Sequence, residues 1–277
     1  MDKKKIDILA AKIRLETLKV IHSRGFGHVG GSVDLAELMA VLYGAEMRFD
    51  PKNPRWPDRD WLVLSKGHAG PVSYATLGIM GYYPLTDAYT LNFPGTHFPS
   101  HTDRKLTPGV DLTTGSLGQG VSTATGAALG NRLDGRDSYV YCVIGDGEAD
   151  EGQVWEAFHF ACAHKLDNII YFIDCNGYQL DGPTDAILPH GNLTAKVAGF
   201  GLHVQEIDGH DTAAIYDAIE KAKAAKGVPS CIVLRTSKGR GATFAEPKHD
   251  HSSQPKEEQW QEALAAAEQA LRDAENA

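Results

Sequence analysis

The chain has 277 residues, of which 42% are hydrophobic and 23% are charged, an ordinary composition for a globular protein that excludes disorder throughout. Its 27 basic and 36 acidic residues give a formal net charge of −9, which argues against nucleic acid or an anionic membrane as the main partner. The four cysteines form no CxxC motif, and charged residues interrupt the N-terminal segment. We therefore expect free thiols, no signal peptide, no membrane span and a cytoplasmic location.

In chain order, the helical spacing of apolar residues predicts a first helix over 6–21, which the glycines of 25–27 end. A second helix is expected after Ser32, because a serine hydroxyl suits the N-cap. The short apolar run 61–64 predicts a buried strand that stops abruptly at Ser-Lys-Gly-His. Prolines recur over 81–116, and we expect that segment to be mostly loop.

From there on, predicted helices and strands alternate. The predicted helices are 118–133, 151–165, 211–226 and a C-terminal amphipathic helix at about 256–275, and the predicted strands are 139–144, 168–174, 203–207 and 231–235. Continuous apolar strands that alternate with helices are typical of a mostly parallel sheet covered on both faces. No repeat or linker divides the chain. We therefore expect one doubly wound α/β domain over residues 1–277.

Polar residues follow two successive predicted strands. Gly145-Asp146-Gly147 ends one strand, and Asn176 follows the next. Ligands of such sheets bind at the carboxyl ends of the strands, so Asp146 and Asn176 are expected in one crevice. A carboxylate, an amide oxygen and a main-chain oxygen suit Mg²⁺ or Ca²⁺, and the N–H groups beside Gly147 suit a phosphate. Taken alone, the motif is also compatible with a simple strand-to-helix turn and an Asn loop cap.

The Gly-Asp-Gly motif followed about thirty residues later by Asn176 resembles the thiamine-diphosphate-binding motif, and the sequence around it resembles transketolase. Five further segments carry the resemblance in the same order: Gly27-His-Val-Gly-Gly31, Leu64-Ser-Lys-Gly-His-Ala69, Thr107-Pro-Gly-Val110, Thr114-Gly-Ser-Leu-Gly-Gln-Gly120 and Lys238-Gly-Arg-Gly241. The resemblance covers the first of the family's three domains, the diphosphate-binding one. It therefore implies the N-terminal subunit of a split transketolase, with a C-terminal subunit that carries the pyrimidine-binding and C-terminal domains in an α2β2 heterotetramer.

The resemblance also implies roles for individual residues. The metal ligands would be Asp146, Asn176 and the main-chain oxygen of Tyr178. The residues around thiamine diphosphate would be His68, Gly115, Ser116, Leu117, Asp146, Gly147, Glu148, Asn176, Leu180 and His251. The catalytic residues would be His28, His68, His101, His251 and Glu151, the last in a carboxylate network between two active sites.

The implied activity is the transfer of a two-carbon ketol unit from a ketose, phosphorylated or similarly anionic, to an aldose, with the histidines moving protons. The partner would supply the Glu that activates the cofactor. His101 is followed by Thr-Asp where the family usually has Pro-Glu, so the sugar stays unnamed. The spacing to Pro255 favours His251 over His249 as the late histidine.

Three alternatives remain. The α subunit of a 2-oxo-acid dehydrogenase shares the Gly-Asp-Gly and Asn motif, but lacks the histidine segments around His28 and His68. A zinc hydrolase could use His97 with His101, or His249 with His251, although no helix-spaced ligand set accompanies either pair. A module that binds the cofactor without turnover is the third.

Overall fold

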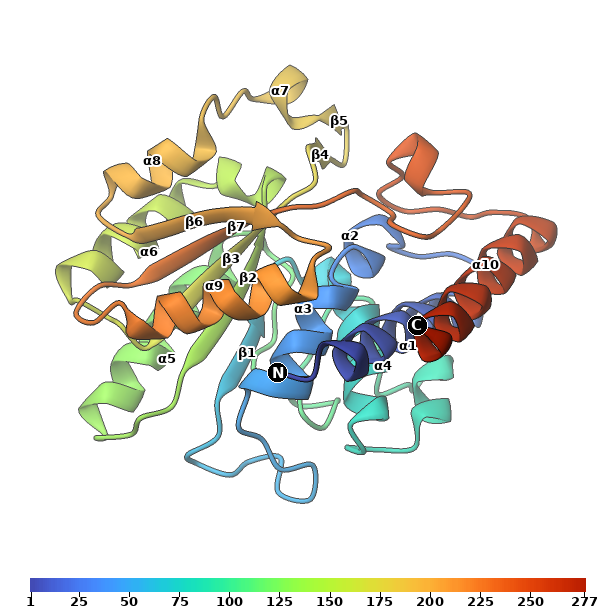
Figure 1. The fold of residues 1–277 in the computed structure, drawn as a ribbon, viewed down its shortest axis with the longest axis horizontal. Coiled ribbons are helices and arrows are strands. Elements are labelled where there is room, and N and C mark those ends of the chain that lie inside the picture. The colour runs from blue at the N-terminus through green and yellow to red at the C-terminus, as the bar shows by residue number, and fades with distance from the viewer.

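The computed structural model describes residues 1–277, and its centre is a parallel sheet of five strands (Figure 1). In order across the sheet, the strands are β1 (Trp61–Leu64), β2 (Val140–Gly145), β3 (Ile169–Cys175), β7 (Ser230–Arg235) and β6 (His203–Asp208). All neighbouring pairs are parallel. The predicted class of fold is confirmed, and the predicted strands coincide with the observed ones to within about a residue, because each is an uninterrupted apolar run.

Helices cover both faces of the sheet, as predicted. One face carries α1 (Lys3–His22), α3 (Ala36–Val41), α4 (Gly70–Ile79), α9 (Thr212–Ala224) and, outside α1, α10 (Glu257–Asn276). The other face carries α5 (Gln119–Leu133), α6 (Gly152–Ala163) and α8 (Leu193–Gly199). Successive residues of a strand point to opposite faces. Tyr141 and Val143 of β2 accordingly enter the first core, and Val140 and Cys142 enter the second.

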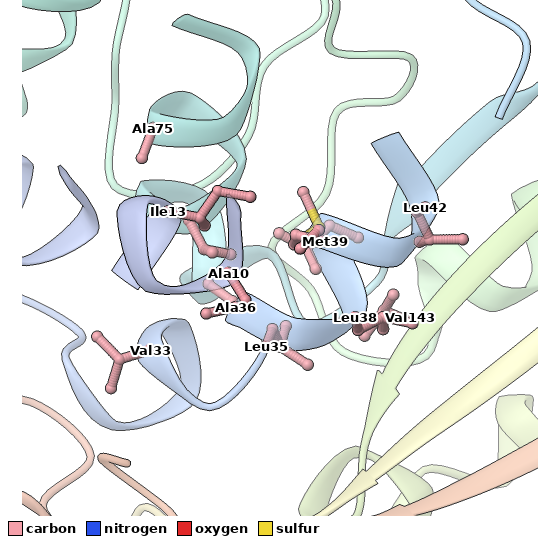
Figure 2. Close-up of a cluster of buried hydrophobic side chains, with 14 of the residues drawn as sticks. Ala10, Ile13, Val33, Leu35, Ala36, Leu38, Met39, Leu42, Ala75 and Val143 are labelled. Atoms are coloured by element: carbon pink, nitrogen blue, oxygen red, sulfur yellow. The ribbon is translucent and has the colours of Figure 1, made fainter. Parts of the chain in front are cut away.

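The N-terminal segment differs from the prediction. Ser32 does not cap a helix, because it lies inside a short helix, α2 (Gly30–Val33), and its hydroxyl donates to the main-chain oxygen of His28 at 2.6 Å. A second helix, α3, starts only at Ala36. Figure 2 shows why this segment is held firmly: Val33, Leu35 and neighbouring apolar side chains of α3 pack among residues of α1, α4 and β2.

The sequence did not predict α4. Most of its residues are buried, so it lacks the polar face from which an amphipathic helix is identified. The remaining short elements are η1 (Leu42–Glu46), η2 (Gly67–Ala69), η3 (Leu85–Thr90), η4 (Gly147–Asp150), β4 (Tyr178–Gln179), β5 (Gly182–Pro183), α7 (Thr184–Ile187) and η5 (Glu246–Lys248). Residues 91–116 hold neither helix nor strand, in line with the predicted loop. The four cysteines are free thiols, and no helix is long and apolar enough to cross a bilayer.

Candidate active site

A cavity of about 230 Å³ is lined by residues that follow the carboxyl ends of β1, β2 and β3. Figure 1 shows α2 and the β4–β5 hairpin near this end of the sheet. The predicted site residues that line the cavity are His28, His68, His101, Gly115, Leu117, Asp146, Gly147, Glu148, Asn176, Tyr178, Leu180 and His251. They come from segments spread over most of the chain. The fold therefore brings together most of the positions that the sequence singled out.

Asp146 and Asn176 meet because β2 and β3 are neighbours in the sheet and end side by side, with Gly145 opposite Asp174. The Asp146 side chain is almost fully buried and accepts hydrogen bonds from the main-chain N–H groups of Gly147 at 2.9 Å and Gly177 at 2.6 Å. Burial and the nearby Asp174 raise the pKa of Asp146 to about 6, against these hydrogen bonds. A cation beside the carboxyl would favour its ionised form.

Sequence reasoning missed the charged residues beneath and beside this crevice. Lys66 is buried, forms an ion pair with Asp174 and lies 3.8 Å from Asp34. Lys238 lines the cavity and donates from Nζ to the main-chain oxygen of Tyr178 at 2.7 Å. Lys66 and Lys238 did lie inside recognised segments, namely Ser-Lys-Gly-His and Lys-Gly-Arg-Gly, so the signal was present in the sequence.

The oxygen atoms at the crevice fit a divalent cation. Asp146 offers a carboxylate, Asn176 an amide oxygen and Tyr178 a main-chain oxygen, which are the hard ligands that Mg²⁺ and Ca²⁺ prefer. The Tyr178 oxygen already accepts a hydrogen bond from the positively charged ammonium group of Lys238. The chain holds no group of three or more His, Cys, Asp and Glu side chains arranged for a metal. That finding does not support the zinc-hydrolase alternative.

The same crevice also fits an anionic group. A Cβ atom on Gly147 would lie 2.6 Å from the Cβ of Gln179, so only glycine allows the main chain to come this close to the hairpin. Gln179 Nε2 and His251 Nδ1 are buried without a hydrogen-bond partner, and both residues line the cavity. Buried polar atoms without partners are uncommon, and a diphosphate would provide acceptors for them.

Four histidine side chains cluster in the cavity. The ring of His28 lies 5.6 Å from His68, 5.6 Å from His101 and 5.4 Å from His251, measured between ring centroids. The rings of His68 and His251 are 4.7 Å apart. His249 does not take part, because its ring stacks on Tyr178 at 4.0 Å and does not line the cavity.

Burial keeps most of this cluster uncharged at neutral pH. Desolvation, with Lys238 and the neighbouring imidazoles, lowers the pKa of His251 to about 3. Desolvation and Lys66 bring the pKa of His68 well below its usual value, and desolvation and His101 lower that of His28. Neutral imidazoles can accept a proton from a hydroxyl group and return it, which general acid–base chemistry requires.

Glu148 lines the cavity, but its carboxylate is used within the chain. Oε1 accepts from the hydroxyl of Ser65 at 2.5 Å and from the N–H of Gly118 at 2.8 Å, and Oε2 accepts from the N–H of Gly145 at 3.1 Å. Glu148 thus ties together the end of β1, the start of α5 and the end of β2. Glu148 thereby fixes the relative positions of these segments at the cavity.

Two predicted residues are not brought into the cavity. Ser116 and Glu151 are exposed and do not line it. Glu151 is the N-cap residue of α6, next to the turn that carries Gly147. At the mouth of the cavity, Leu117 is 37% exposed and Leu180 is 70% exposed, so the rim is apolar.

Comparison with known proteins gives a consistent picture. The family model "Transketolase, thiamine diphosphate binding domain" matches residues 5–269. The chain is 50% identical over 271 residues to the "6-deoxy-6-sulfo-D-fructose transketolase subunit SqwG" of Clostridium sp. (strain MSTE9), and the match covers 97% of this chain and 98% of that protein.

Longer transketolases match over part of their length. Human transketolase is 34% identical over 258 residues, which is 92% of this chain and 41% of the human protein. The crystal structure of transketolase from Campylobacter jejuni superimposes with a TM-score of 0.88 at 30% identity, covering 99% of this chain and 46% of that one. The chain therefore spans less than half the length of these relatives.

Proposed function

This chain belongs to the transketolase family and corresponds to its thiamine-diphosphate-binding domain, and we propose that it acts as the N-terminal subunit of a two-chain transketolase. The observation that carries the proposal is the single cavity in which Asp146 and Asn176 lie beside four histidines. A diphosphate site alone needs no such cluster, whereas the conversion of sugar hydroxyl and carbonyl groups needs proton donors and acceptors.

In this proposal residues 1–277 act as a single diphosphate-binding domain. Asp146, Asn176 and the Tyr178 oxygen hold Mg²⁺ or Ca²⁺, while Gly147, His68 and His251 hold the diphosphate. Gly115, Leu117 and Leu180 face the organic part of the cofactor. Bound there, thiamine diphosphate supplies the electron sink for breaking the C2–C3 bond of a ketose.

In this proposal the protein's own residues anchor the cofactor, exclude water from the site and move protons. His28, His68, His101 and His251 stand close enough to contact neighbouring oxygen atoms of one sugar. Since the pKa values of His28, His68 and His251 are lowered, these rings first accept a proton from a sugar hydroxyl and then donate it to the forming one. Such a group typically contributes about 10²- to 10⁴-fold to the rate.

The donor class follows from the relative of matching length. SqwG is named for 6-deoxy-6-sulfo-D-fructose, and half of the aligned residues are identical. We propose a ketose with an anionic group as donor, and this sulfonated ketose as the first candidate. A panel of 6-deoxy-6-sulfo-D-fructose, D-fructose 6-phosphate and pyruvate, assayed with both subunits present, tests it. Turnover of pyruvate alone would support a 2-oxo-acid dehydrogenase subunit instead.

The cofactor site has a direct test in the assembled enzyme. Asp146→Ala and Asn176→Ala are expected to abolish Mg²⁺-dependent binding of thiamine diphosphate in calorimetry, because each removes an oxygen ligand, while circular dichroism stays that of the folded protein. Asp217→Ala, an exposed position on α9, is the control and should bind normally. Unchanged cofactor affinity in both site variants would refute the metal assignment.

The proposed assembly is an α2β2 heterotetramer in the cytoplasm. The apolar rim formed by Leu117 and Leu180 supports a covering partner, since exposed apolar side chains at a cavity mouth are typical of interfaces. SqwG, which matches nearly end to end, is itself named a subunit, which supports a division of the enzyme between chains. Glu151, exposed beside the cavity, is proposed to act across such an interface.

A further inference from the structure

Two buried carboxylates that do not line the cavity hold the side chain of Asn176. Its Nδ2 donates to Asp34 Oδ2 at 3.0 Å and to Asp174 Oδ2 at 3.1 Å. A primary amide has two N–H hydrogens, so both are used. The amide oxygen consequently faces the other way, where it accepts from the main-chain N–H of Tyr178 at 3.1 Å.

This arrangement permits one orientation of the amide. If the amide turned around, its carbonyl oxygen would face two carboxylate oxygens and both hydrogen bonds would be lost. A partly buried amide that lost both hydrogen bonds would be left unsatisfied, so the observed orientation is favoured. The same orientation presents an oxygen, and not an N–H group, toward the crevice that also holds Asp146.

The two carboxylates differ in how they are held. Asp174 accepts from the Lys66 ammonium group and from the hydroxyl of Thr236, so it has other partners. The Asp34 side chain has no hydrogen-bond partner besides Asn176: its Oδ1 is buried without a hydrogen bond and has only a loose ion pair with Lys66 Nζ, 3.8 Å away. An incompletely satisfied buried carboxylate lowers stability, so its presence calls for another explanation.

The position of Asp34 is well fixed. It follows α2 directly, and its neighbours Val33 and Leu35 are fully buried in the core around α1 and α3 (Figure 2). The rigid backbone thus carries a carboxylate oxygen to Asn176 from an element more than a hundred residues away in sequence.

We propose that Asp34 is a positioning residue of the metal site, which orients the Asn176 amide so that its oxygen faces the divalent cation. The inference rests on the proposed function, in which Asn176 is a metal ligand. Asp34 itself touches neither the metal nor the substrate. It acts through Asn176, in the way that partners of metal ligands fix which ligand atom is presented.

Mn²⁺ titrations of the assembled enzyme, with both chains and saturating thiamine diphosphate present, are followed through the electron paramagnetic resonance of free Mn²⁺ and test the proposal without an activity assay. Asp34→Leu removes the acceptor and is expected to weaken Mn²⁺ binding on the order of 10- to 100-fold. Asp34→Ala removes it with less crowding and should behave alike. Asp34→Asn keeps an oxygen acceptor, so it should retain most of the affinity.

The Asn176→Asp protein serves as a second background for the Asp34 variants. It separates an effect on the orientation of the Asn176 amide from a general effect on the structure. Asn176→Asp has no amide to orient, because both carboxylate oxygens are equivalent. In that background Asp34→Leu should cost no further Mn²⁺ affinity, so the two changes should be non-additive. The same loss in both backgrounds would overturn the proposal, and so would a loss in Asp34→Asn as large as in Asp34→Leu.

Asp60→Leu is the matched control. Asp60 is a buried carboxylate that accepts from the main-chain N–H groups of Arg48 and Tyr139, each at 2.8 Å, near the amino end of β1. Its loss should lower stability and leave the Mn²⁺ affinity of the folded chain unchanged. Wild-type affinity in Asp34→Leu would contradict the inference alone. No Mn²⁺ binding by the wild-type assembled enzyme would overturn the metal site and the inference together.

Discussion

At the scale of single residues, the site is unusual in the groups that surround its four histidines. The four imidazoles of the cavity have other imidazoles and two lysines nearby, and no carboxylate forms an ion pair with any of them. Some histidines elsewhere in the chain do lie within ion-pair distance of a carboxylate, namely His22 with Glu257 and His210 with Glu37. These surroundings favour the neutral form of His28, His68 and His251 and are compatible with the anionic ligand that we propose.

The proton-handling role predicts a difference between turnover and assembly. His28→Ala and His251→Ala should each lower turnover on the order of 10²-fold in the assembled enzyme, since each removes one acid–base group. His164→Ala, exposed at the end of α6, should be near normal. Steady-state kinetics on the three variants measures this, and equal losses in all three would remove the specific role.

The lowered pKa of His251 predicts a pH dependence of stability. The unfolded chain takes up this proton near pH 6.5, whereas the folded chain does so only at about 3. The neutral His251 therefore contributes fully to the folding free energy above pH 6.5, and this contribution is lost as the pH falls. The loss of stability reaches up to about 2 kcal/mol at pH 5. Thermal unfolding at pH 7 and pH 5 should show a smaller loss for His251→Gln than for the wild type. Equal losses would show that His251 is not held neutral.

At the scale of elements, the cavity depends on the junctions of three segments. Glu148 joins the ends of β1 and β2 to the start of α5 through Ser65, Gly145 and Gly118. These bonds fix the loop that carries Gly115 and Leu117 relative to the crevice. One buried carboxylate thus sets the geometry between the segments that we propose hold the two ends of the cofactor.

Glu148→Ala should therefore destabilise the fold by about 2–5 kcal/mol, because it leaves buried N–H groups unsatisfied at roughly 1–3 kcal/mol each. Urea unfolding monitored by circular dichroism measures the change. Glu262→Ala, an exposed position on α10, should stay within about 0.5 kcal/mol of the wild type. A Glu148→Ala protein as stable as the control would mean that these hydrogen bonds do not hold the segments together.

The sequence predicted the strands and the crevice well, and it predicted α4 and the start of α2 poorly. The strands were predictable because each is an apolar run, and the crevice followed because neighbouring parallel strands end together. The helix α4 was not predictable from periodicity, since it is buried on nearly all sides. Ser32 misled because it lies inside the short helix α2, where its hydroxyl donates to the main-chain oxygen of His28 and does not cap a helix.

The contacts between the buried charged residues under the site could not be predicted from the sequence, for a different reason. Lys66 and Asp174 are 108 residues apart, and Asp34 and Asn176 are 142 residues apart, so no local pattern relates them. Most histidines and glycines were identified because they lie in segments that resemble a family. Ser116 and Glu151, identified in the same way, do not line the cavity of this chain, and their role remains a prediction.

At the scale of the whole molecule, we propose that the cavity is half of a site. This chain contains a crevice beside Asp146 and Asn176, a histidine cluster and an apolar rim, and it spans 41% of human transketolase. In our account the cofactor's aminopyrimidine and the Glu that activates it belong with a second chain. The exposed Leu117 and Leu180 would then be buried where the two chains meet.

Reconstitution tests this account most directly. The purified chain alone should show no ketol transfer from 6-deoxy-6-sulfo-D-fructose or D-fructose 6-phosphate in the presence of thiamine diphosphate and Mg²⁺. Addition of a chain that carries the family's pyrimidine-binding and C-terminal domains should restore transfer and shift the chain to a heteromer in size-exclusion chromatography. Ketol transfer by this chain alone, shown by mass spectrometry to be free of the partner, would contradict the account.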